Sequence, residues 1–325
     1  MPRALLCRTW GPIEGLELAH LPPATPGPGE VVVTMKAVAL NFPDVLVVQG
    51  KYQFKPPFPF APGSELSGVV NAVGAGVSRF RPGDEVIGVP LFGALADEVV
   101  VPQERLMHKP AGMPWDVAAA LTISHGTTLH ALKDRAALQA GETLLVLGAA
   151  GGTGLAAIEL GKVMGARVIA AASTPDKLDL CRRTGADEVI DYSREDLKER
   201  VRELTGGRGA DVIYDPVGGP YAEPALRAIA WNGRYLVIGF AHGDIPKLPL
   251  NLLLLKGCAA VGVFWGDFVR REPERNEANM GELFSLVADG RISPHVSGHF
   301  TLETAVDALR LIAARLATGK IIVKP

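Results

Sequence analysis

The most constraining feature of this sequence is the glycine-rich stretch LLVLGAAGGTG at residues 144–154. Its apolar run predicts a buried strand, its glycines a tight turn, and the apolar periodicity that follows predicts a helix. Gly151, Gly152 and Gly154 allow the backbone to approach a diphosphate, whose charge the amides of a helix N-terminus favour. The spacing departs from GxGxxG at its first position, which is Ala149. Because glycine is common in turns, the motif alone also fits an ordinary turn.

A second buried run, residues 167–172, follows this motif and completes a βαβ unit. Enzymes that bind NAD carry Asp or Glu at the end of this second strand, where the acid binds the ribose 2′-hydroxyl. This chain has Ala172, Ser173 and Thr174 there, and Lys177 one helical turn further on. A hydroxyl and an ammonium suit a 2′-phosphate, so the sequence predicts NADPH as the cofactor. Alternatively, Thr174 is a helix N-cap and Lys177 is only solvated.

Length and composition exclude several classes of protein. A chain of 325 residues predicts two domains. A net charge of −2 gives no polybasic surface, so we expect no nucleic-acid partner. No apolar run approaches the roughly 20 residues of a membrane span, and we expect no membrane partner. Three cysteines without short spacings predict no disulfide or zinc framework and indicate a reduced, cytoplasmic setting.

Proline usage marks a change in architecture near Trp115. Sixteen of the 25 prolines precede this residue, and only one lies between Trp115 and Asp215. Proline is excluded from helix interiors and central strands, so the first part is predicted to be an irregular β-rich domain. Its expected strands are residues 4–7, 30–40, 65–73, 85–89 and 96–101.

The proline-poor middle of the chain alternates strands and helices, which is typical of a doubly wound parallel sheet. Two helices are expected from Trp115, a short buried helix near Asn251, a helix over residues 273–288 and another from Thr301. The last strand, KIIVKP, has no local partner and is expected to return to the first domain. The six expected strands of the sheet are residues 143–147, 167–172, 188–192, 211–217, 234–240 and 258–264.

The irregular stretch 41–65 of the first domain combines polar groups with aromatic side chains. Asn41 and Tyr52 in such a loop suit the binding of a flat apolar substrate. The three phenylalanines beside them fit ordinary packing better than substrate contact.

These motifs together resemble the medium-chain dehydrogenase/reductase superfamily over nearly the whole chain, and specifically its zinc-free quinone oxidoreductase branch, which includes zeta-crystallin. The resemblance implies a six-stranded Rossmann domain at residues 123–266 and a discontinuous GroES-like catalytic domain at residues 1–122 and 267–325. The motifs are NFPD from Asn41, PGSELSGVVNAVGAGV from Pro62, GDEV from Gly83, LGAAGGTGLAAIELGK from Leu147, GADEVIDY from Gly185, DPVGG from Asp215 and TGKIIV from Thr318.

Two positions separate this chain from the zinc-dependent alcohol dehydrogenases. Those enzymes carry a ligand cysteine near the NFPD position, where this chain has Asn41. They carry a ligand histidine in a GHE motif, where this chain has Gly63, Ser64 and Glu65. The lobe with a four-cysteine structural zinc has no counterpart. Zinc needs three or four N or S ligands around one point, so the sequence predicts no metal site.

The resemblance also implies roles for individual residues. Asn41 and Thr127 are expected beside the nicotinamide, and Tyr52 at the substrate cleft. Substrate preference cannot be transferred, because Leu46 and Phe264 differ from some relatives. The remaining cofactor residues are implied to be Ala150, Gly151, Gly152 and Thr153 at the diphosphate, Ser173, Lys177, Tyr192 and Arg315 at the 2′-phosphate, and Ile238, Phe240 and Phe264 at the nicotinamide pocket.

The leading functional hypothesis is reduction of quinones by NADPH, with Asn41 or Tyr52 donating a hydrogen bond to developing oxyanion charge. One alternative is reduction of an activated C=C bond in an enal, enone or enoyl thioester. Arg270, Arg271 and Arg275 suit a coenzyme A phosphate in that case, although a solvated helix start is the simpler interpretation.

A further alternative is a structural or RNA-binding protein that only holds NADPH, as zeta-crystallin illustrates. The resemblance also implies a homodimer paired through the sixth strand, residues 258–264.

Overall fold

The computed structural model describes all 325 residues, which form two compact units. The first unit comprises Met1–Ile123 and Pro294–Pro325, and the second comprises Ser124–Ser293. The first division falls inside helix α2 (Trp115–Leu129). The sequence prediction began the returning segment at residue 267, whereas the structure begins it at Pro294, because the two helices before Pro294 pack on the second unit.

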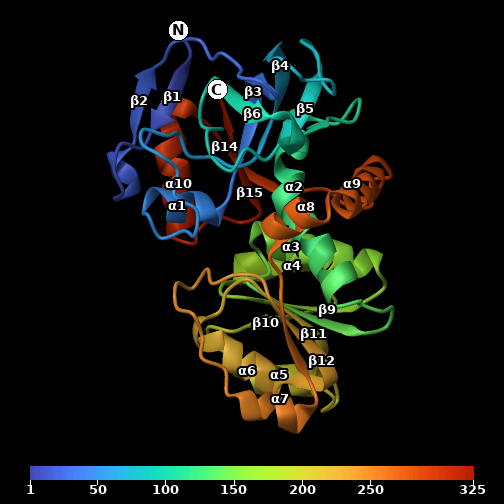
Figure 1. Cartoon of the computed structure of the whole chain (residues 1–325). Coiled ribbons are helices and arrows are strands. Elements are labelled where there is room, and N and C mark those ends of the chain that lie inside the picture. Colours follow the sequence, from blue (N-terminus) through green and yellow to red (C-terminus); the bar gives the residue numbers. More distant parts are fainter. The chain divides into compact units, whose positions relative to one another are not determined.

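The first unit is built on a mixed sheet of seven strands (Figure 1). The strand order is β14-β15-β3-β4-β5-β7, and β6 pairs with β3 beside this path. A separate antiparallel pair joins β1 to β2. The strands are β1 (Arg3–Leu6), β2 (Glu17–His20), β3 (Glu30–Leu40), β4 (Leu66–Val73), β5 (Glu85–Gly88), β6 (Glu98–Pro102), β7 (Leu106–His108), β14 (Val296–Thr301) and β15 (Lys320–Lys324).

The five strands predicted for this unit are present with small shifts of their ends, and β3 has the predicted bounds. The prediction missed β2, β7 and β14. Strands β2 and β7 have only four and three residues, and the side chains of β14 alternate between half-buried and exposed, so none of them has a clear apolar signature. It also missed α1 (Phe42–Val48), although Asn41 at the N-cap and Asp44 at the third position are a recognisable helix start.

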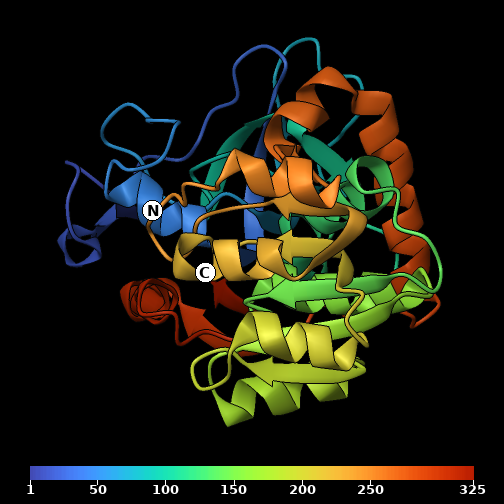
Figure 2. The ribbon, with the colours of Figure 1, turned by 90° about the horizontal axis from the view of Figure 1, so that it is seen from below.

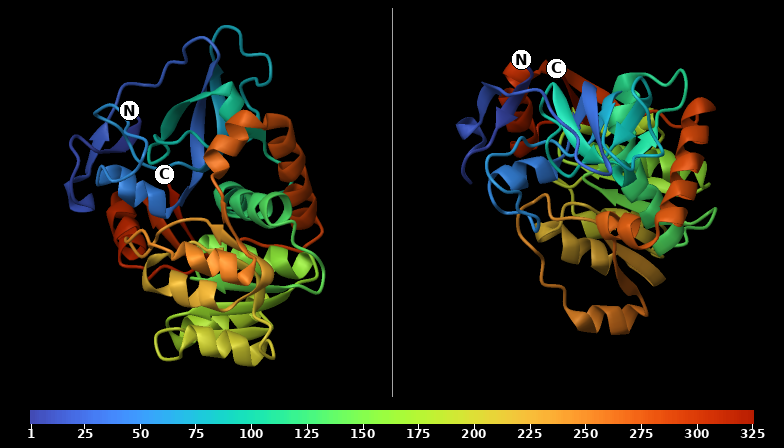
Figure 3. Two further views of the ribbon diagram at one scale, coloured as in Figure 1. Left: turned by 60° about the horizontal axis from the view of Figure 1, so that its bottom comes forward. Right: turned by 45° about the horizontal axis from the view of Figure 1, so that its top comes forward.

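The C-terminal segment of the chain belongs to the first unit. Strand β15 returns as predicted and pairs antiparallel with β3, but it also pairs with β14, so the expectation of no local partner is wrong. Helix α10 (Ala305–Ala313), which follows the 3₁₀ turn η5 (Leu302–Thr304), lies beside α1 (Figure 3). The other 3₁₀ turns of this unit are η1 (Ile13–Gly15) and η2 (Gln103–Arg105).

The second unit is a six-stranded, wholly parallel sheet with the order β10-β9-β8-β11-β12-β13 (Figure 2). This is the doubly wound dinucleotide-binding topology, so the predicted fold class is confirmed. The strands are β8 (Thr143–Leu147), β9 (Arg167–Ala172), β10 (Glu188–Asp191), β11 (Ala210–Asp215), β12 (Ile229–Val237) and β13 (Ala259–Gly262).

Helices cover both faces of this sheet (Figure 1). One face is covered by α3 and α4, and the other by α5, α6 and α7, whose apolar side chains share one core cluster with the strands. The bounds are α3 (Gly152–Val163), α4 (Pro175–Thr184), α5 (Leu197–Leu204), η4 (Gly219–Tyr221), α6 (Ala222–Arg227) and α7 (Leu250–Lys256).

Two helical predictions need correction. The segment from Trp115 is a single helix, α2, that continues into a π-helical turn, η3 (His130–Arg135), rather than two helices. Helix α7 is short as predicted but is not buried, since Leu250 and Leu254 are 77% and 80% exposed. No helix in the structure is long and apolar enough to cross a membrane.

The π-helical turn anchors α8 (Trp265–Arg271) and α9 (Pro273–Ala288) to the second unit. His130 stacks on Phe268 with ring centroids 3.8 Å apart. The carboxylate of Asp134 accepts hydrogen bonds from His130 and Asn279 and forms an ion pair with Arg275 at 2.8 Å. These contacts explain why α8 and α9 belong to the second unit although they follow its last strand.

Candidate functional site

The glycine-rich turn lies between β8 and α3, as the sequence predicts. Gly151 is the N-cap of α3, and the helix begins at Gly152. The amides of the first helical turn have no intrahelical acceptor, which leaves them available for an anion. Ala150 is buried beneath the turn, whereas Gly151, Gly152 and Thr153 are half-buried.

The close packing of this turn requires glycine at Gly154. A Cβ at that position would lie 2.5 Å from the carbonyl oxygen of Gly148 and 2.7 Å from the carbonyl carbon of Ala149. At Gly151 a Cβ would meet only the Gly148 oxygen, at 3.4 Å. The two glycines therefore differ: the fold itself needs Gly154, whereas Gly151 leaves space on the surface of the turn. That space and the free amides fit a dinucleotide diphosphate.

Three of the residues implied at the 2′-phosphate come together in the second unit. Parallel pairing sets Asp191 of β10 opposite Ala172 of β9, and the Tyr192 amide donates to the Ala172 carbonyl at 3.1 Å. Ser173 and Tyr192 therefore follow the ends of adjacent strands, and Lys177 lies in the first turn of α4. Burial lowers the pKa of Lys177.

The capping interpretation of the segment after β9 is confirmed, and the phosphate role of Lys177 stays a prediction. The Thr174 hydroxyl accepts from the Lys177 amide at 3.4 Å, so Thr174 is the N-cap of α4. The Lys177 side chain is half-buried rather than fully solvated. No acid follows Ala172, and Asp191, which pairs with Ala172 from β10, accepts from the amide and hydroxyl of Ser193. The donor set therefore suits a phosphate. Arg315, the fourth implied residue, is exposed after α10 of the first unit.

The residues implied at the nicotinamide in the second unit follow the ends of β12 and β13. Ile238 directly follows β12, Phe240 lies two residues beyond it, and Phe264 caps α8 after β13. Phe264 is 65% exposed. Thr127 of α2 is half-buried in the same unit.

A buried hydroxyl pair supports the turn from below. The hydroxyl of Thr128 donates to the Ser124 carbonyl at 2.8 Å and lies 2.9 Å from the hydroxyl of Tyr214 on β11 and 3.4 Å from the Thr153 carbonyl. Desolvation raises the pKa of Tyr214, which keeps its phenol neutral. Sequence analysis missed this pair because the two hydroxyls meet only through the strand order.

Asp215 fixes the turn at the end of β11. Its carboxylate accepts from the amides of Val217 and Gly218 and from the hydroxyl of Tyr235 on β12. Burial raises the pKa of Asp215, and burial beside this carboxylate raises that of Tyr235. The DPVGG motif is therefore held by a hydrogen-bonded carboxyl.

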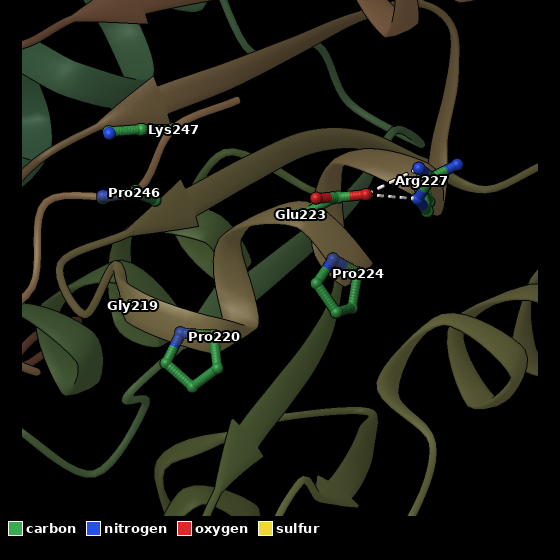
Figure 4. Close-up of a pocket in the computed structure, with 7 residues that line it drawn as sticks. All are labelled: Gly219, Pro220, Glu223, Pro224, Arg227, Pro246 and Lys247. Atoms are coloured by element: carbon green, nitrogen blue, oxygen red, sulfur yellow. Dashed lines mark hydrogen bonds and ion pairs between the residues drawn. The ribbon is translucent and has the colours of Figure 1, made fainter. Parts of the chain in front are cut away.

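The second unit also has a surface pocket next to the DPVGG turn (Figure 4). Its charged pair, Glu223 and Arg227, is joined by an ion pair at 2.6 Å within α6. None of the predicted cofactor residues lines it, so it does not correspond to the predicted site. The lining residues are Gly219, Pro220, Glu223, Pro224, Arg227, Pro246 and Lys247.

The first unit contains a buried polar cluster of Asn41, Asp44, Ser64, Glu65 and Lys320, here called the Lys320 cluster. Antiparallel pairing of β3 with both β4 and β15 brings the end of β3 next to the residue before β4 and the first residue of β15. The Lys320 ammonium donates to Asn41 Oδ1 at 2.6 Å and to Glu65 Oε2 at 2.8 Å. Asn41 Nδ2 donates to Glu65 Oε2 at 3.1 Å.

The cluster continues to Asp44 and Tyr52. Asp44 accepts from the Asn41 amide at 2.7 Å and from the Ser64 hydroxyl at 2.8 Å. Burial raises the pKa of Asp44 to about 6. Burial, and then the charge of Asp44, raises the pKa of Tyr52, so its hydroxyl stays protonated at neutral pH. The structure thus brings Asn41 and Tyr52 into one electrostatic neighbourhood.

Sequence analysis did not assign a role to Lys320, Glu65 or Asp44. Lys320 is 279 residues from Asn41, and no local pattern indicates that they meet. The capping motif at Asn41 and Asp44 was the one signal available.

No group of three or more His, Cys, Asp or Glu side chains in the structure is arranged to hold a metal ion. The resemblance sets Asn41 and the segment Gly63, Ser64, Glu65 at the zinc-ligand positions of the alcohol dehydrogenases. The Asn41 amide and the Ser64 hydroxyl are both hydrogen-bonded within the cluster. This donor set does not suit zinc.

Comparisons with known proteins agree with this architecture. Residues 27–111 match the alcohol dehydrogenase GroES-like domain, and residues 152–283 match the zinc-binding dehydrogenase domain. The chain is 42% identical over 300 residues to quinone oxidoreductase-like protein 2 homolog of Nematostella vectensis, covering 91% of this chain and 82% of the relative. It is 37% identical to a quinone oxidoreductase of Pseudomonas aeruginosa over the full length of both.

The chain belongs to the quinone oxidoreductase branch of the medium-chain dehydrogenase/reductase superfamily. Solved members of the family have the same fold. The quinone oxidoreductase of Pseudomonas syringae is 33% identical with a TM-score of 0.94, and both chains are fully covered. That of Escherichia coli, solved in complex with NADPH, is 29% identical with a TM-score of 0.91 over both full chains. The enoyl reductase CurK is 27% identical with a TM-score of 0.88, covering 99% of each chain. The sequence-based family assignment is therefore confirmed.

Proposed function

We propose that this oxidoreductase reduces quinones by direct hydride transfer from NADPH, without zinc. The observation that carries the proposal is the Lys320 cluster. Hydrogen-bonded Asn41 and Ser64 stand where zinc enzymes of the superfamily hold ligands. Without a Lewis acid, the acceptor must itself be electron-poor, and a quinone meets this requirement.

NADPH is the cofactor, in agreement with the solved neighbour that contains it. When bound, NADPH supplies the hydride, and water supplies the proton that completes the hydroquinone. The glycine-rich turn holds the diphosphate on the first-turn amides of α3. Ser173, Lys177 and Tyr192 hold the 2′-phosphate, a role that the resemblance also implies for Arg315.

Tyr52 is the proposed donor to the acceptor oxygen. Both amide hydrogens of Asn41 already have acceptors, Glu65 and the Ala39 carbonyl. The Tyr52 hydroxyl makes no hydrogen bond within the protein, and its raised pKa keeps the proton on it. A donor aimed at developing negative charge lowers the barrier to reduction. Asn41 and Thr127 then shape the space beside the nicotinamide.

The test is steady-state oxidation of NADPH and NADH by chelator-treated protein, with an ortho-quinone and a para-quinone as acceptors. We expect quinone turnover that prefers NADPH and is unchanged by added zinc. Tyr52→Phe is expected to lower kcat about tenfold or more, because one oxyanion donor is lost. The control is the Kd for NADPH of Tyr52→Phe, which should match the wild type because Tyr52 is not placed at the cofactor. Turnover of Tyr52→Phe at the wild-type rate would remove the donor role.

Reduction of an activated C=C bond remains a second candidate, because the solved neighbours include an enoyl reductase. The arginines considered for a coenzyme A phosphate have acidic partners. Arg270 and Arg271 pair with Asp267, and Arg275 pairs with Asp134 and Glu272. The positive charge of these arginines is therefore largely compensated by acidic side chains of the protein. Saturation of a crotonyl thioester much faster than any quinone would favour this candidate.

We also propose a homodimer in which β13 pairs with its symmetry mate. Strand β13 is an edge of the parallel sheet, and Ala259 and Ala260 on it are exposed. Trp231 and Leu255 add large apolar side chains, each 70% exposed. A second copy would cover this surface. A monomeric mass at micromolar concentration would overturn the dimer.

A cytoplasmic location is proposed on the cysteines alone. Cys7, Cys181 and Cys258 are all free thiols, and Cys7 and Cys181 are buried. Measuring thiol content in protein isolated under alkylating conditions tests the reduced setting.

A further inference from the structure

The Lys320 cluster holds two buried carboxyl groups and one buried cation. Glu65 is fully buried, Lys320 is 3% exposed and Asp44 is 2% exposed. Burying a charge is unfavourable unless a partner compensates it. Lys320 forms a direct ion pair with Glu65, whereas Asp44 has only hydrogen-bond donors, Ser64 and the Asn41 amide.

The hydrogen bonds of the cluster allow only one orientation of the Asn41 side chain. An ammonium can only donate, so the atom facing Lys320 must be Oδ1. A carboxylate can only accept, so the atom facing Glu65 must be Nδ2. Rotating the amide by half a turn would set donor against donor and acceptor against acceptor. The ion pair therefore fixes the amide of Asn41, the residue that the proposed function assigns to the nicotinamide.

The same ion pair also sets the net charge of the cluster near Tyr52. Hydride transfer to a quinone brings negative charge to the acceptor oxygen. An uncompensated Glu65 would oppose that charge in a region of low dielectric. Lys320 cancels it, so the remaining charge of the cluster depends on whether Asp44 is protonated.

We propose that Lys320 is a positioning residue for hydride transfer: it locks the amide of Asn41 and cancels the charge of Glu65. This inference rests on the proposed function, because only a reaction that delivers negative charge benefits from the cancellation. Lys320 acts through its neighbours and is not itself placed against the substrate.

The charges of Lys320 and Glu65 act on Asp44 in opposite directions. The proposal therefore predicts the direction in which each substitution shifts the titration of Asp44. Burial raises the pKa of Asp44, while its bonds to Asn41 and Ser64 and the charge of Lys320 lower it, and Glu65 raises it. Removing Lys320 should therefore move the titration of Asp44 to higher pH. Neutralising Glu65 should move it to lower pH.

The experiment measures kcat/KM against pH for the wild type, Lys320→Met and Glu65→Gln. In the wild type we expect activity to fall as Asp44 ionises near pH 6. Lys320→Met should move this inflection upward and lower kcat at least tenfold, with the Kd for NADPH within twofold of wild type. Glu65→Gln should move the inflection downward. The matched control is Lys324→Met, which removes an exposed lysine of the same strand and should leave the inflection in place.

A double variant keeps the test interpretable if Lys320→Met alone fails to fold. Lys320→Met with Glu65→Gln removes both charges together and leaves no unpaired buried ion. We expect this variant to fold but to keep a kcat at least tenfold below wild type, because the Asn41 amide is no longer locked. Full recovery of kcat in the double variant, or single variants with an unmoved inflection, would overturn the proposal.

A readout without turnover separates this inference from the proposed function. The backbone amide of Asn41 donates to Asp44, so its NMR shift in ¹⁵N-Asn-labelled protein reports the titration. If the wild type does not reduce quinones, the proposed function fails. If it does, but the NMR midpoints shift while the kcat/KM profiles do not follow, Lys320 does not serve the reaction and the inference fails.

Discussion

Replacing Gly154 by Ala should separate the role of the glycine-rich turn in folding from its role in binding. The new Cβ would lie 2.5 Å from the Gly148 carbonyl oxygen and 2.7 Å from the carbonyl carbon of Ala149. Both are backbone atoms that cannot move aside, so α3 must shift away from the turn. The matched variant is Gly151→Ala, whose Cβ meets only one atom, at 3.4 Å.

The sizes of the two effects follow from these contacts. Contacts this short with backbone atoms put the overpacking cost in the upper part of its range, about 2–3 kcal/mol, and the better helix propensity of alanine returns about 1 kcal/mol. Gly154→Ala should therefore destabilise the protein by about 1–2 kcal/mol. This corresponds to a fall in Tm of roughly 2–8 °C. Gly151 has an extended backbone, with φ −77° and ψ 171°, that alanine adopts readily. The cost of Gly151→Ala comes only from the fact that alanine is a weaker N-cap than glycine, which is worth about 0.5 kcal/mol.

The assay combines thermal unfolding without cofactor and NADPH titration by fluorescence. Gly154→Ala should lower both Tm and NADPH affinity, the latter about tenfold, because the turn amides move. Gly151→Ala should keep Tm nearly unchanged but lower NADPH affinity, since its methyl group occupies the space left for the diphosphate. A Gly154→Ala protein with wild-type Tm would refute the packing argument. Undiminished affinity in Gly151→Ala would refute the diphosphate placement.

Three further predictions follow from single groups. Lys177→Ala should weaken NADPH binding about tenfold in fluorescence titrations while leaving NADH binding unchanged, because only NADPH carries the 2′-phosphate. Tyr235→Phe removes a buried donor to Asp215 and should lower the free energy of unfolding by about 1–3 kcal/mol in urea denaturation; a smaller loss would mean that the Asp215 carboxyl finds another donor. Burial favours the neutral form of Asp44, so its contribution to stability is present below its unfolded pKa of 3.8 and is lost as pH rises to about 6. Relative to Asp44→Asn, the unfolding free energy should fall by about 3 kcal/mol across that window, and a parallel pH dependence of the two proteins would contradict the raised pKa.

Features that depend on neighbouring residues were predictable from the sequence. The run from β8 through the glycine-rich turn to α3 and β9 was predicted with the strand bounds that the structure has. Strand, turn and helix each have their own residue pattern, and a βαβ unit has one favoured handedness. The absence of an acid after Ala172 could also be read from the sequence, because the apolar run that predicts β9 ends at that residue.

The tertiary structure decided what depends on strands far apart in the chain. Lys320 meets Asn41 only because β15 pairs with β3 in one register, and a shift by one residue would turn its side chain to the other face. Burial then turns ordinary Lys, Glu and Asp residues into a coupled cluster with a raised pKa at Asp44. Sequence patterns describe local backbone preference, whereas desolvation and pairing of charges depend on which distant side chains share one low-dielectric space.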